Sequence, residues 1–289
     1  MSSTRLPRLG NTEFNLIFAN FCTKYMPYDT GICQYIKKIK CIYTNWIYKT
    51  AGYYDKDIPD KEIYLYPDDF TNKLDSFIDN MGKVLFGFDE AGALPLSSFS
   101  KIDHPLHQYI PHFENYYKVK LFPRNIDARC GISLIKDKKR ILVISPFKEL
   151  IDKQIESGNL KILQPSLAAA EFIIYKFPYT FLNNGPHRDS IETLDIIKQD
   201  LINNYNDFDM AILSCGCYGI FLMDTICNTM NKDAAYIGGQ LPLIFGIIGQ
   251  RDKWALRELY NKQTDYVIDG VPEAYRPQGY EKIENGCYW

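Results

Sequence analysis

Short apolar runs and amphipathic segments alternate along residues 138–239, and this alternation restricts the fold more than any other feature of the chain. The expected strands are residues 138–145, 170–178, 209–214 and 234–239, and the expected helices between them are residues 146–158, 189–205 and 220–230. Strands that alternate with helices pair in parallel through right-handed crossovers. We therefore expect an α/β fold with a Rossmann-like, doubly wound, mostly parallel sheet.

The first third of the chain has a different pattern. Apolar residues recur at helical spacing in segments such as 30–48 and 69–81, and the first short strand candidate is KVLFGF, residues 83–88. We therefore divide the chain into an N-terminal helical subdomain, residues 1–82, and a Rossmann-like α/β domain, residues 83–289, which contains the candidate binding loops.

Charge and cysteine usage narrow the class of protein. Lysine and arginine total 33 against 35 aspartates and glutamates, which gives a net charge of -2 and argues against a nucleic-acid partner. The eight cysteines include no C-x-x-C pair, so we expect free thiols in a reducing compartment, with Cys215 and Cys217 buried and inert. No apolar run is long enough to span a bilayer and the first residues lack a secretory signal, so we expect a cytoplasmic protein.

The residues that follow the strands are the candidates for a binding site, because ligands of a doubly wound sheet bind beyond the carboxyl ends of its strands. Small, polar or acidic residues stand at or just after the carboxyl ends of four of the expected strands. They are Asp89 and Glu90, then Ser145, Pro146 and Phe147, then Gly216, Cys217, Tyr218 and Gly219, and finally Gly238, Gly239 and Gln240. We expect these loops to meet at one edge of the sheet.

Two of these loops, SCGCYG and GGQ, are candidates for phosphate binding. Amides at a helix start bind anions, and glycine lets a backbone approach a ligand closely. SCGCYG is not a G-x-G-x-x-G fingerprint, and close strand–helix packing is the alternative explanation of its glycines. Ser145 can cap the helix that starts at Pro146 or Phe147. Arg251 can meet a phosphate or a departing diphosphate, or lie at an ordinary exposed helix start.

Two segments are candidates for metal binding. Asp89 and Glu90 can hold a divalent cation, Mn²⁺ or Mg²⁺, or act as a catalytic base, whereas the alternative is a solvated acidic turn. The segment HPLHQYIPH places His104, His107 and His112 within nine residues. Its two prolines prevent one regular helix from presenting all three imidazoles.

Several strings in the C-terminal two thirds resemble a known group. They are ILVISPFKELIDKQI, DFDMAILSCGCYGIFLMDTI, AAYIGGQLPLIFGIIGQR and the terminal ENGCYW. They resemble proteins often found among polysaccharide and surface-glycan genes, and that group is similar to glycosyltransferases of the GT-D fold. The resemblance covers residues 83–289. It implies that an acidic D-x-E element, in a context like R-F-G-D-G-E after an early strand, binds a metal and the donor diphosphate. The matching place is LFGFDEAG, where Asp89 and Glu90 are adjacent and Leu85 replaces the arginine.

The resulting functional hypothesis is a glycosyltransferase that moves a sugar from a nucleotide-sugar donor to a glycan or other hydroxyl acceptor. Two alternatives stay open. One is an S-adenosylmethionine-dependent or other nucleotide-cofactor transferase. The other is a non-catalytic sugar- or nucleotide-binding module whose 22 tyrosines stack on sugars. The sequence does not decide between a monomer and a homo-dimer.

Overall fold

A computed structural model describes residues 4–26, 30–58, 71–93, 107–123, 126–261 and 263–289. Its main sheet has five strands in the order β1-β8-β7-β5-β6, and every pair is parallel. The strands are β1 (Arg5–Leu6), β5 (Arg140–Ser145), β6 (Glu171–Lys176), β7 (Met210–Leu213) and β8 (Asp233–Tyr236). The parallel α/β sheet predicted from the alternation is confirmed, and all four predicted strands of residues 138–239 belong to it.

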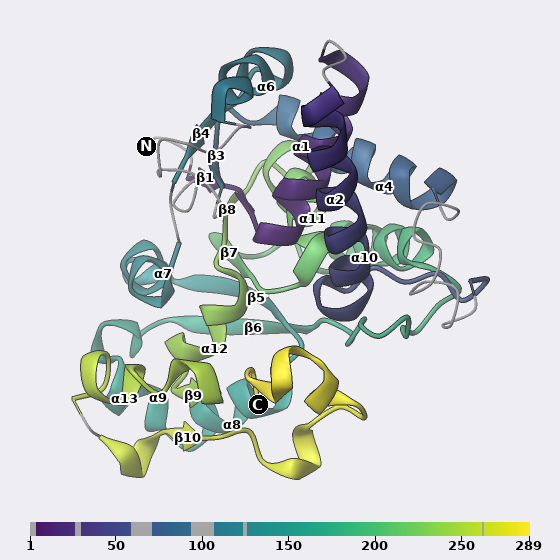
Figure 1. The fold of residues 1–289 in the computed structure, drawn as a ribbon. Helices are drawn as coiled ribbons and strands as arrows, with labels where there is room; N and C mark the ends of the chain where they lie inside the picture. The colour runs from purple at the N-terminus through teal and green to yellow at the C-terminus, as the bar shows by residue number, and fades with distance from the viewer. Residues whose placement is uncertain (1–3, 27–29, 59–70, 94–106, 124–125, 262) are drawn as a thin grey trace.

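Helices cover both faces of this sheet (Figure 1). Successive residues of a strand point to opposite faces, so Leu142 and Ile144 of β5 join one apolar cluster while Ile141 and Val143 join the other. The first cluster includes α10 (Ser190–Asn204) and α11 (Gly219–Asp224), which continues as η6 (Thr225–Thr229). The second includes α8 (Lys148–Glu156), α9 (Asn159–Leu163) and α12 (Leu241–Ile244). The doubly wound arrangement is therefore present.

The strand order reverses at β5. The chain leaves β5, passes through α8 and α9 on one face and pairs as β6 on one side of it. It then returns through α10 on the opposite face and pairs as β7 on the other side of β5. Because the flanking helices diverge to opposite faces, a crevice opens at the carboxyl ends of β5 and β7.

Local sequence explains where α10 begins. The Asp189 side chain accepts hydrogen bonds from the backbone N–H groups of Ile191 and Glu192, at 3.0 and 2.9 Å. Aspartate at this position satisfies amides that have no partner inside the helix and places a negative charge at its positive end. The N-cap is therefore Asp189, and the hydroxyl of the next residue, Ser190, accepts a hydrogen bond from the Tyr54 amide at 2.7 Å.

The strand predicted at residues 83–88 is wrong. Helix α4 (Thr71–Val84) continues through the first two of these residues, and a 3-10 turn, η2 (Leu85–Gly87), takes up the next three. The buried apolar residues of this region have helical spacing and include Leu74, Phe77, Met81 and Leu85. This spacing buries Leu85 but leaves Phe86 exposed, so KVLFGF forms the end of a helix and a 3-10 turn, and the strand of this region begins only at Glu90.

A second, three-stranded parallel sheet has the order β2-β3-β4. Its strands are β2 (Arg8–Leu9), β3 (Glu90–Ala93) and β4 (Lys120–Phe122). Strand β2 follows β1 after a single residue, Pro7. The extended segment at the start of the chain therefore joins both sheets: β1 pairs with the main sheet and β2 with the small sheet.

The N-terminal helices pack on the main sheet's first apolar cluster. They are α1 (Asn11–Tyr25), α2 (Thr30–Trp46), η1 (Ile47–Ala51) and α4, with α6 (Ile110–Tyr117) alongside them. That cluster extends across the predicted domain boundary at residue 83, since Phe14 and Phe77 belong to it together with Leu142 and Leu222. Residues 1–82 are also not helical alone, because β1 and β2 are strands.

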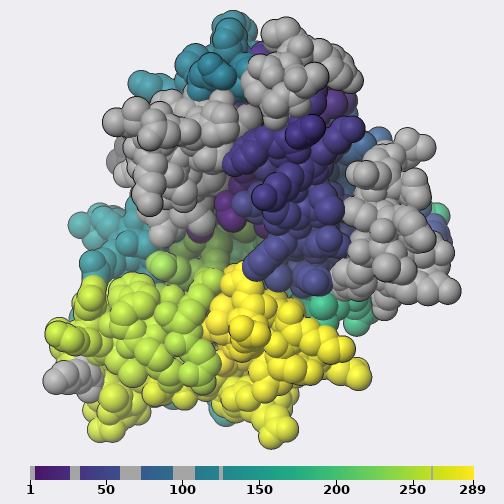
Figure 2. All heavy atoms as spheres, viewed as in Figure 1, coloured from purple at the N-terminus to yellow at the C-terminus, as the bar shows by residue number. Residues whose placement is uncertain are grey.

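The remaining elements lie beside the second apolar cluster. They are α7 (Ala128–Ile135), β9 (Ile247–Ile248), α13 (Ala255–Glu258) and β10 (Ile268–Asp269), and short 3-10 turns follow to Trp289. The C-terminal segment lies against the N-terminal helices in the space-filling view (Figure 2). Among the helices of the described ranges, none combines the length and apolar character needed to cross a bilayer.

Candidate functional site

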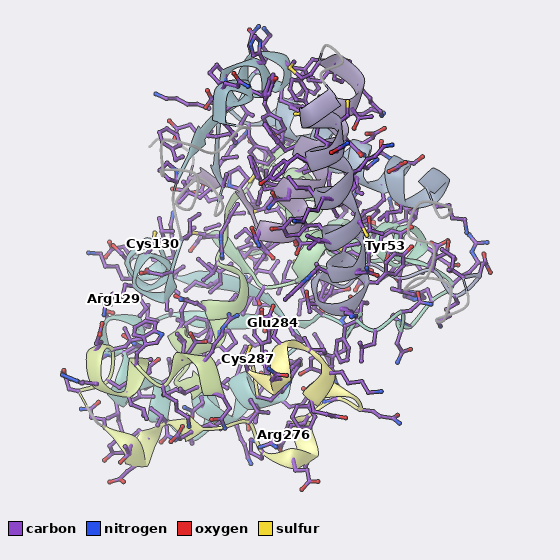
Figure 3. All side chains as sticks on the ribbon, viewed as in Figure 1. Tyr53, Arg129, Cys130, Arg276, Glu284 and Cys287 are labelled. Atoms are coloured by element: carbon purple, nitrogen blue, oxygen red, sulfur yellow. The ribbon has the colours of Figure 1, made fainter. Side chains whose placement is uncertain are left out.

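A cleft of about 340 Å³ lies at the crevice where the strand order reverses. Its floor includes the residues that follow β5 and β7, from Pro146 and from Ser214. One wall consists of the turn from β2 into α1 together with Thr50–Gly52. The other wall is formed by residues 177–181 and by the C-terminal segment, on which Figure 3 labels Glu284 and Cys287. Segments from both ends of the chain therefore meet over the strand ends.

The cleft brings together part of the predicted set. Its lining includes Pro146, Phe147, Gly216, Gly238, Gly239 and Arg251. Five further residues of the predicted set lie at or just after the ends of the same strands but do not line the cleft: Ser145, Cys217, Tyr218, Gly219 and Gln240. The fully buried Ser145 hydroxyl accepts from the Phe147 amide at 3.2 Å, and the Gln240 side chain accepts from the Ala128 amide at 3.3 Å. The loops after β5, β7 and β8 thus converge as expected.

Asp89 and Glu90 do not lie in this cleft. Their predicted position after a strand is wrong, because Glu90 is the first residue of β3 and Asp89 precedes it. The Asp89 carbonyl accepts from the Lys120 amide at 2.8 Å, as part of the small sheet. Strand β3 runs parallel to β2, and β2 reaches the cleft at its carboxyl end. The two carboxylates therefore lie at the amino end of their strand, away from the cleft.

The turn from β2 into α1 contributes cleft residues that were not predicted from the sequence. Arg8, Gly10, Asn11, Thr12 and Glu13 all line the cleft. They read R-L-G-N-T-E and follow an early strand. Three of these six residues agree with the R-F-G-D-G-E context, and three differ, because leucine, asparagine and threonine replace phenylalanine, aspartate and the second glycine. Sequence reasoning missed these residues, and the one local signal is Gly10, the residue before α1.

Glu13 is a buried carboxyl group in the cleft wall, with 8% of the residue exposed. Burial raises the pKa of this carboxyl above its ordinary value, and a hydrogen bond to its own backbone and the charge of Arg8 offset the increase only in part. Its side chain folds back to Gly10, where a Cβ atom would collide with the carboxylate. A carboxyl group with a raised pKa inside a cleft is a candidate for proton transfer.

Arg8 lies between the start of α1, which carries Glu13, and the turn after β8. Its Nη1 donates to the Ile237 carbonyl at 2.6 Å. Gly238 makes this approach possible, because its φ is +71° and a Cβ atom there would lie 2.5 Å from Nη1. The Arg8 Nε is buried and has no hydrogen-bond acceptor within the described part of the chain. The glycine of this turn therefore makes room for a guanidinium group.

Arg251 reaches the cleft from η8 (Gln250–Asp252), and 33% of its side chain is exposed. Its Nε donates to Asp252 at 3.2 Å, and its guanidinium lies 4.0 Å from the centroid of the Tyr288 ring. Burial lowers the pKa of this guanidinium, but Tyr288 and Asp252 act in the opposite direction and the pKa is raised. A Cβ atom at Gly239 would collide with its Nη2. Each glycine of the GGQ turn thus accommodates one arginine.

Aromatic side chains form another part of the cleft lining. The ring centroids of Tyr179 and Phe181 are 5.9 Å apart, and Trp289 lies 6.4 and 6.2 Å from them. All three residues line the cleft. Clustered aromatic rings beside cationic groups suit a ligand that has both a flat or apolar part and an anionic part.

The cysteines and histidines singled out in the sequence give no reactive or metal-binding centre in the described ranges. Burial raises the pKa of the Cys215 and Cys217 thiols, and both residues are packed in the core. His104 lies outside the described residues, and His112 is exposed on α6. In the part of the chain that the structure describes, no three His, Cys, Asp or Glu side chains are grouped to hold a metal ion.

Comparison of the chain with family models, with curated proteins and with solved structures found no match in any of the three. The class of protein is therefore defined by fold and cleft alone: a doubly wound α/β protein with an arginine-containing cleft at its topological switch point.

Proposed function

We propose that the cleft binds a nucleotide-sugar through its diphosphate and that the protein transfers the sugar to a hydroxyl group of a glycan or another acceptor. One observation carries this proposal: two arginines, two glycine turns and a buried glutamate meet at the carboxyl ends of parallel strands. Guanidinium groups pair with phosphate through two parallel hydrogen bonds, and switch points of α/β sheets bind nucleotides.

Each part of the cleft has a role in this proposal. Arg8 and Arg251 bind the diphosphate, and the aromatic wall of Tyr179, Phe181 and Trp289 receives the base or the sugar. In the reaction, the bond from the anomeric carbon to the phosphate oxygen breaks and a bond from the acceptor oxygen to that carbon forms. The nucleoside diphosphate leaves with the electron pair, and the acceptor proton passes to Glu13. The raised pKa of Glu13 suits it for accepting that proton.

The test begins with binding. UDP, GDP, ADP, CDP and dTDP are each added to the full-length protein, and thermal unfolding is followed with and without Mn²⁺. At least one diphosphate is expected to raise Tm, and the corresponding nucleoside without phosphate is expected to have a much smaller effect. No shift with any of the five would contradict the proposal, and a shift with S-adenosylmethionine in their place would favour a cofactor-dependent transferase.

Turnover is tested separately by measuring release of nucleoside diphosphate from nucleotide-sugars, with and without glycan acceptors. Glu13→Gln is expected to bind the diphosphate and to lose about two to four orders of magnitude in turnover, which is typical for removal of a general base. Binding by the original protein without any turnover would favour the non-catalytic binding module.

A further inference from the structure

The residues at the start of α1 do not fit a divalent metal. The resemblance places its two carboxylates at Asp89 and Glu90, which do not line the cleft. In the turn that does line the cleft, Asn11 supplies an uncharged amide. Its side-chain carbonyl already accepts a hydrogen bond from Asn15 Nδ2 at 3.0 Å, and its Nδ2 lies 3.4 Å from the Tyr43 hydroxyl. Mg²⁺ and Mn²⁺ are usually bound by one or two carboxylates with free oxygens, so this asparagine is a poor substitute.

The other carboxylates nearby do not compensate. Glu13 is buried, its carboxylate is folded back against Gly10, and the positive charge of Arg8 already acts on it. Glu284 is the other acidic side chain that lines the cleft in the described residues, and it lies 3.8 Å from Arg251 Nη1. The positive charges of Arg8 and Arg251 also oppose a cation in this space.

We infer that this cleft neutralises the phosphate of its ligand with Arg8 and Arg251 in place of a divalent cation. The inference depends on the proposed function, because it names the groups that bind the diphosphate. The contact between Arg251 and Glu284 is longer than a hydrogen bond, so a phosphate oxygen can replace it. Asp252 and the Tyr288 ring hold the guanidinium of Arg251 in position, and Arg8 lines the same cleft as a second cation.

Calorimetry tests the inference on the full-length protein. The tightest binder among UDP, GDP, ADP, CDP and dTDP is titrated in buffer with EDTA and in buffer with Mg²⁺ or Mn²⁺. The Kd is expected to agree within about twofold in the three buffers, and Mn²⁺ titrated alone is expected to give no saturable binding. Binding that requires the metal would overturn the inference and leave the proposed function standing. Absence of diphosphate binding in every buffer would instead refute the proposed function itself.

Variants identify the cation. Arg251→Met is expected to weaken diphosphate binding in EDTA by about tenfold or more, which is the loss expected for a hydrogen bond to a charged group. Arg251→Lys, which keeps the charge, is expected to lose less. Arg257→Met removes an exposed cation of α13 outside the cleft and is expected to bind normally. Circular dichroism and Tm check that each variant is folded. Equal binding by the Arg251→Met and Arg257→Met variants would overturn the assignment.

Discussion

The guanidinium of Arg251 lies 4.0 Å from the centre of the Tyr288 ring, and the backbones of the two segments are joined as well. The Arg251 amide donates to the Cys287 carbonyl at 3.1 Å, and a Cβ atom at Gly249 would lie 2.7 Å from the Tyr288 carbonyl oxygen. The C-terminal segment therefore packs directly against Arg251, the cation that we assign to phosphate binding. This arrangement makes the orientation of Arg251 depend on a ring 37 positions later in the sequence.

Removing the Tyr288 ring tests this dependence. Tyr288→Leu is expected to weaken nucleoside diphosphate binding by about 1 kcal/mol, because a cation stacked on an aromatic ring gains about 0.5–2 kcal/mol. Tyr288→Phe keeps the ring and is expected to bind within about twofold of the original protein. Calorimetry measures both values. Equal losses in the two variants would mean that the hydroxyl, which lies 3.5 Å from Glu284, matters more than the ring.

The buried carboxyl of Glu13 predicts a pH-dependent effect on stability. Its pKa is raised in the folded protein above the unfolded value of about 4.5. Its protonated form is therefore favoured by folding, and this contribution is full below the unfolded pKa and is lost as pH rises through the folded pKa. Glu13→Gln has no charge to bury, so its stability relative to the original protein is expected to increase as pH rises from about 4 to 8.

Denaturant unfolding at several pH values measures this difference. At the acid end the two proteins are expected to agree within about 0.5 kcal/mol, because a protonated glutamate and a glutamine are similar in size and polarity. Glu156→Gln changes an exposed residue of α8 and serves as the control, with a difference that is expected to stay flat. A flat difference for Glu13→Gln would show that its carboxyl is not buried in solution.

The main sheet could be predicted from the sequence because its central strands are short, continuous apolar runs. In a parallel sheet covered on both faces, every residue of such a strand is buried, as in β7. The helix expected at residues 189–205 and the convergence of three loops follow from the same local signals. Parallel strands place their carboxyl ends at one edge of the sheet, so this part of the cleft could be predicted without details of side-chain packing.

The missed part of the cleft depends on pairing between distant segments. β1 and β2 have two residues each, too few for any periodicity, and β1 exists as a strand because it pairs with β8 more than 220 residues later. KVLFGF was misassigned because short apolar runs do not distinguish a strand from the buried face of a helix. Whether Cys217 and Tyr218 face the cleft or the core depends on a 3-10 turn, η5 (Gly216–Tyr218). The glycines allow this turn, but they do not predict it.

Tyr218 has a structural role that can be separated from ligand binding. Its buried hydroxyl lies 2.9 Å from Ser190 Oγ and 3.2 Å from the Gly52 carbonyl, which positions the wall at Thr50–Gly52. Tyr218→Phe is expected to lower the free energy of unfolding by about 1–3 kcal/mol, because the partners lose a buried hydrogen bond. Tyr266→Phe, at a residue that is 37% exposed, is expected to change it by less than about 0.5 kcal/mol.

Chemical denaturation measures both free energies, and the affinity for a nucleoside diphosphate is measured on the same samples. The expected outcome for Tyr218→Phe is a loss of stability with affinity changed by less than about threefold. A folded variant that is as stable as the original protein but fails to bind would contradict the structural role and restore Tyr218 as a direct ligand contact.

The glycines at 238 and 158 form a matched pair for the last prediction. Both have positive φ, +71° and +77°, so alanine is strained at either position by about 1 kcal/mol. A Cβ atom at Gly158 would meet nothing within 4 Å, whereas at Gly238 it would lie 2.5 Å from Arg8 Nη1. The two substitutions therefore impose a similar backbone cost, but one of them also displaces the guanidinium from the Ile237 carbonyl.

Gly158→Ala is expected to lower the free energy of unfolding by about 1 kcal/mol and to leave diphosphate binding unchanged. Gly238→Ala is expected to lose a further 1 kcal/mol or so, for the broken hydrogen bond, and to bind the diphosphate about tenfold more weakly because Arg8 is moved. Unfolding and calorimetry on the two variants give the comparison directly. Normal binding by a folded Gly238→Ala protein would show that Arg8 supports the turn after β8 without contacting the ligand, and phosphate binding would then rest on Arg251 alone.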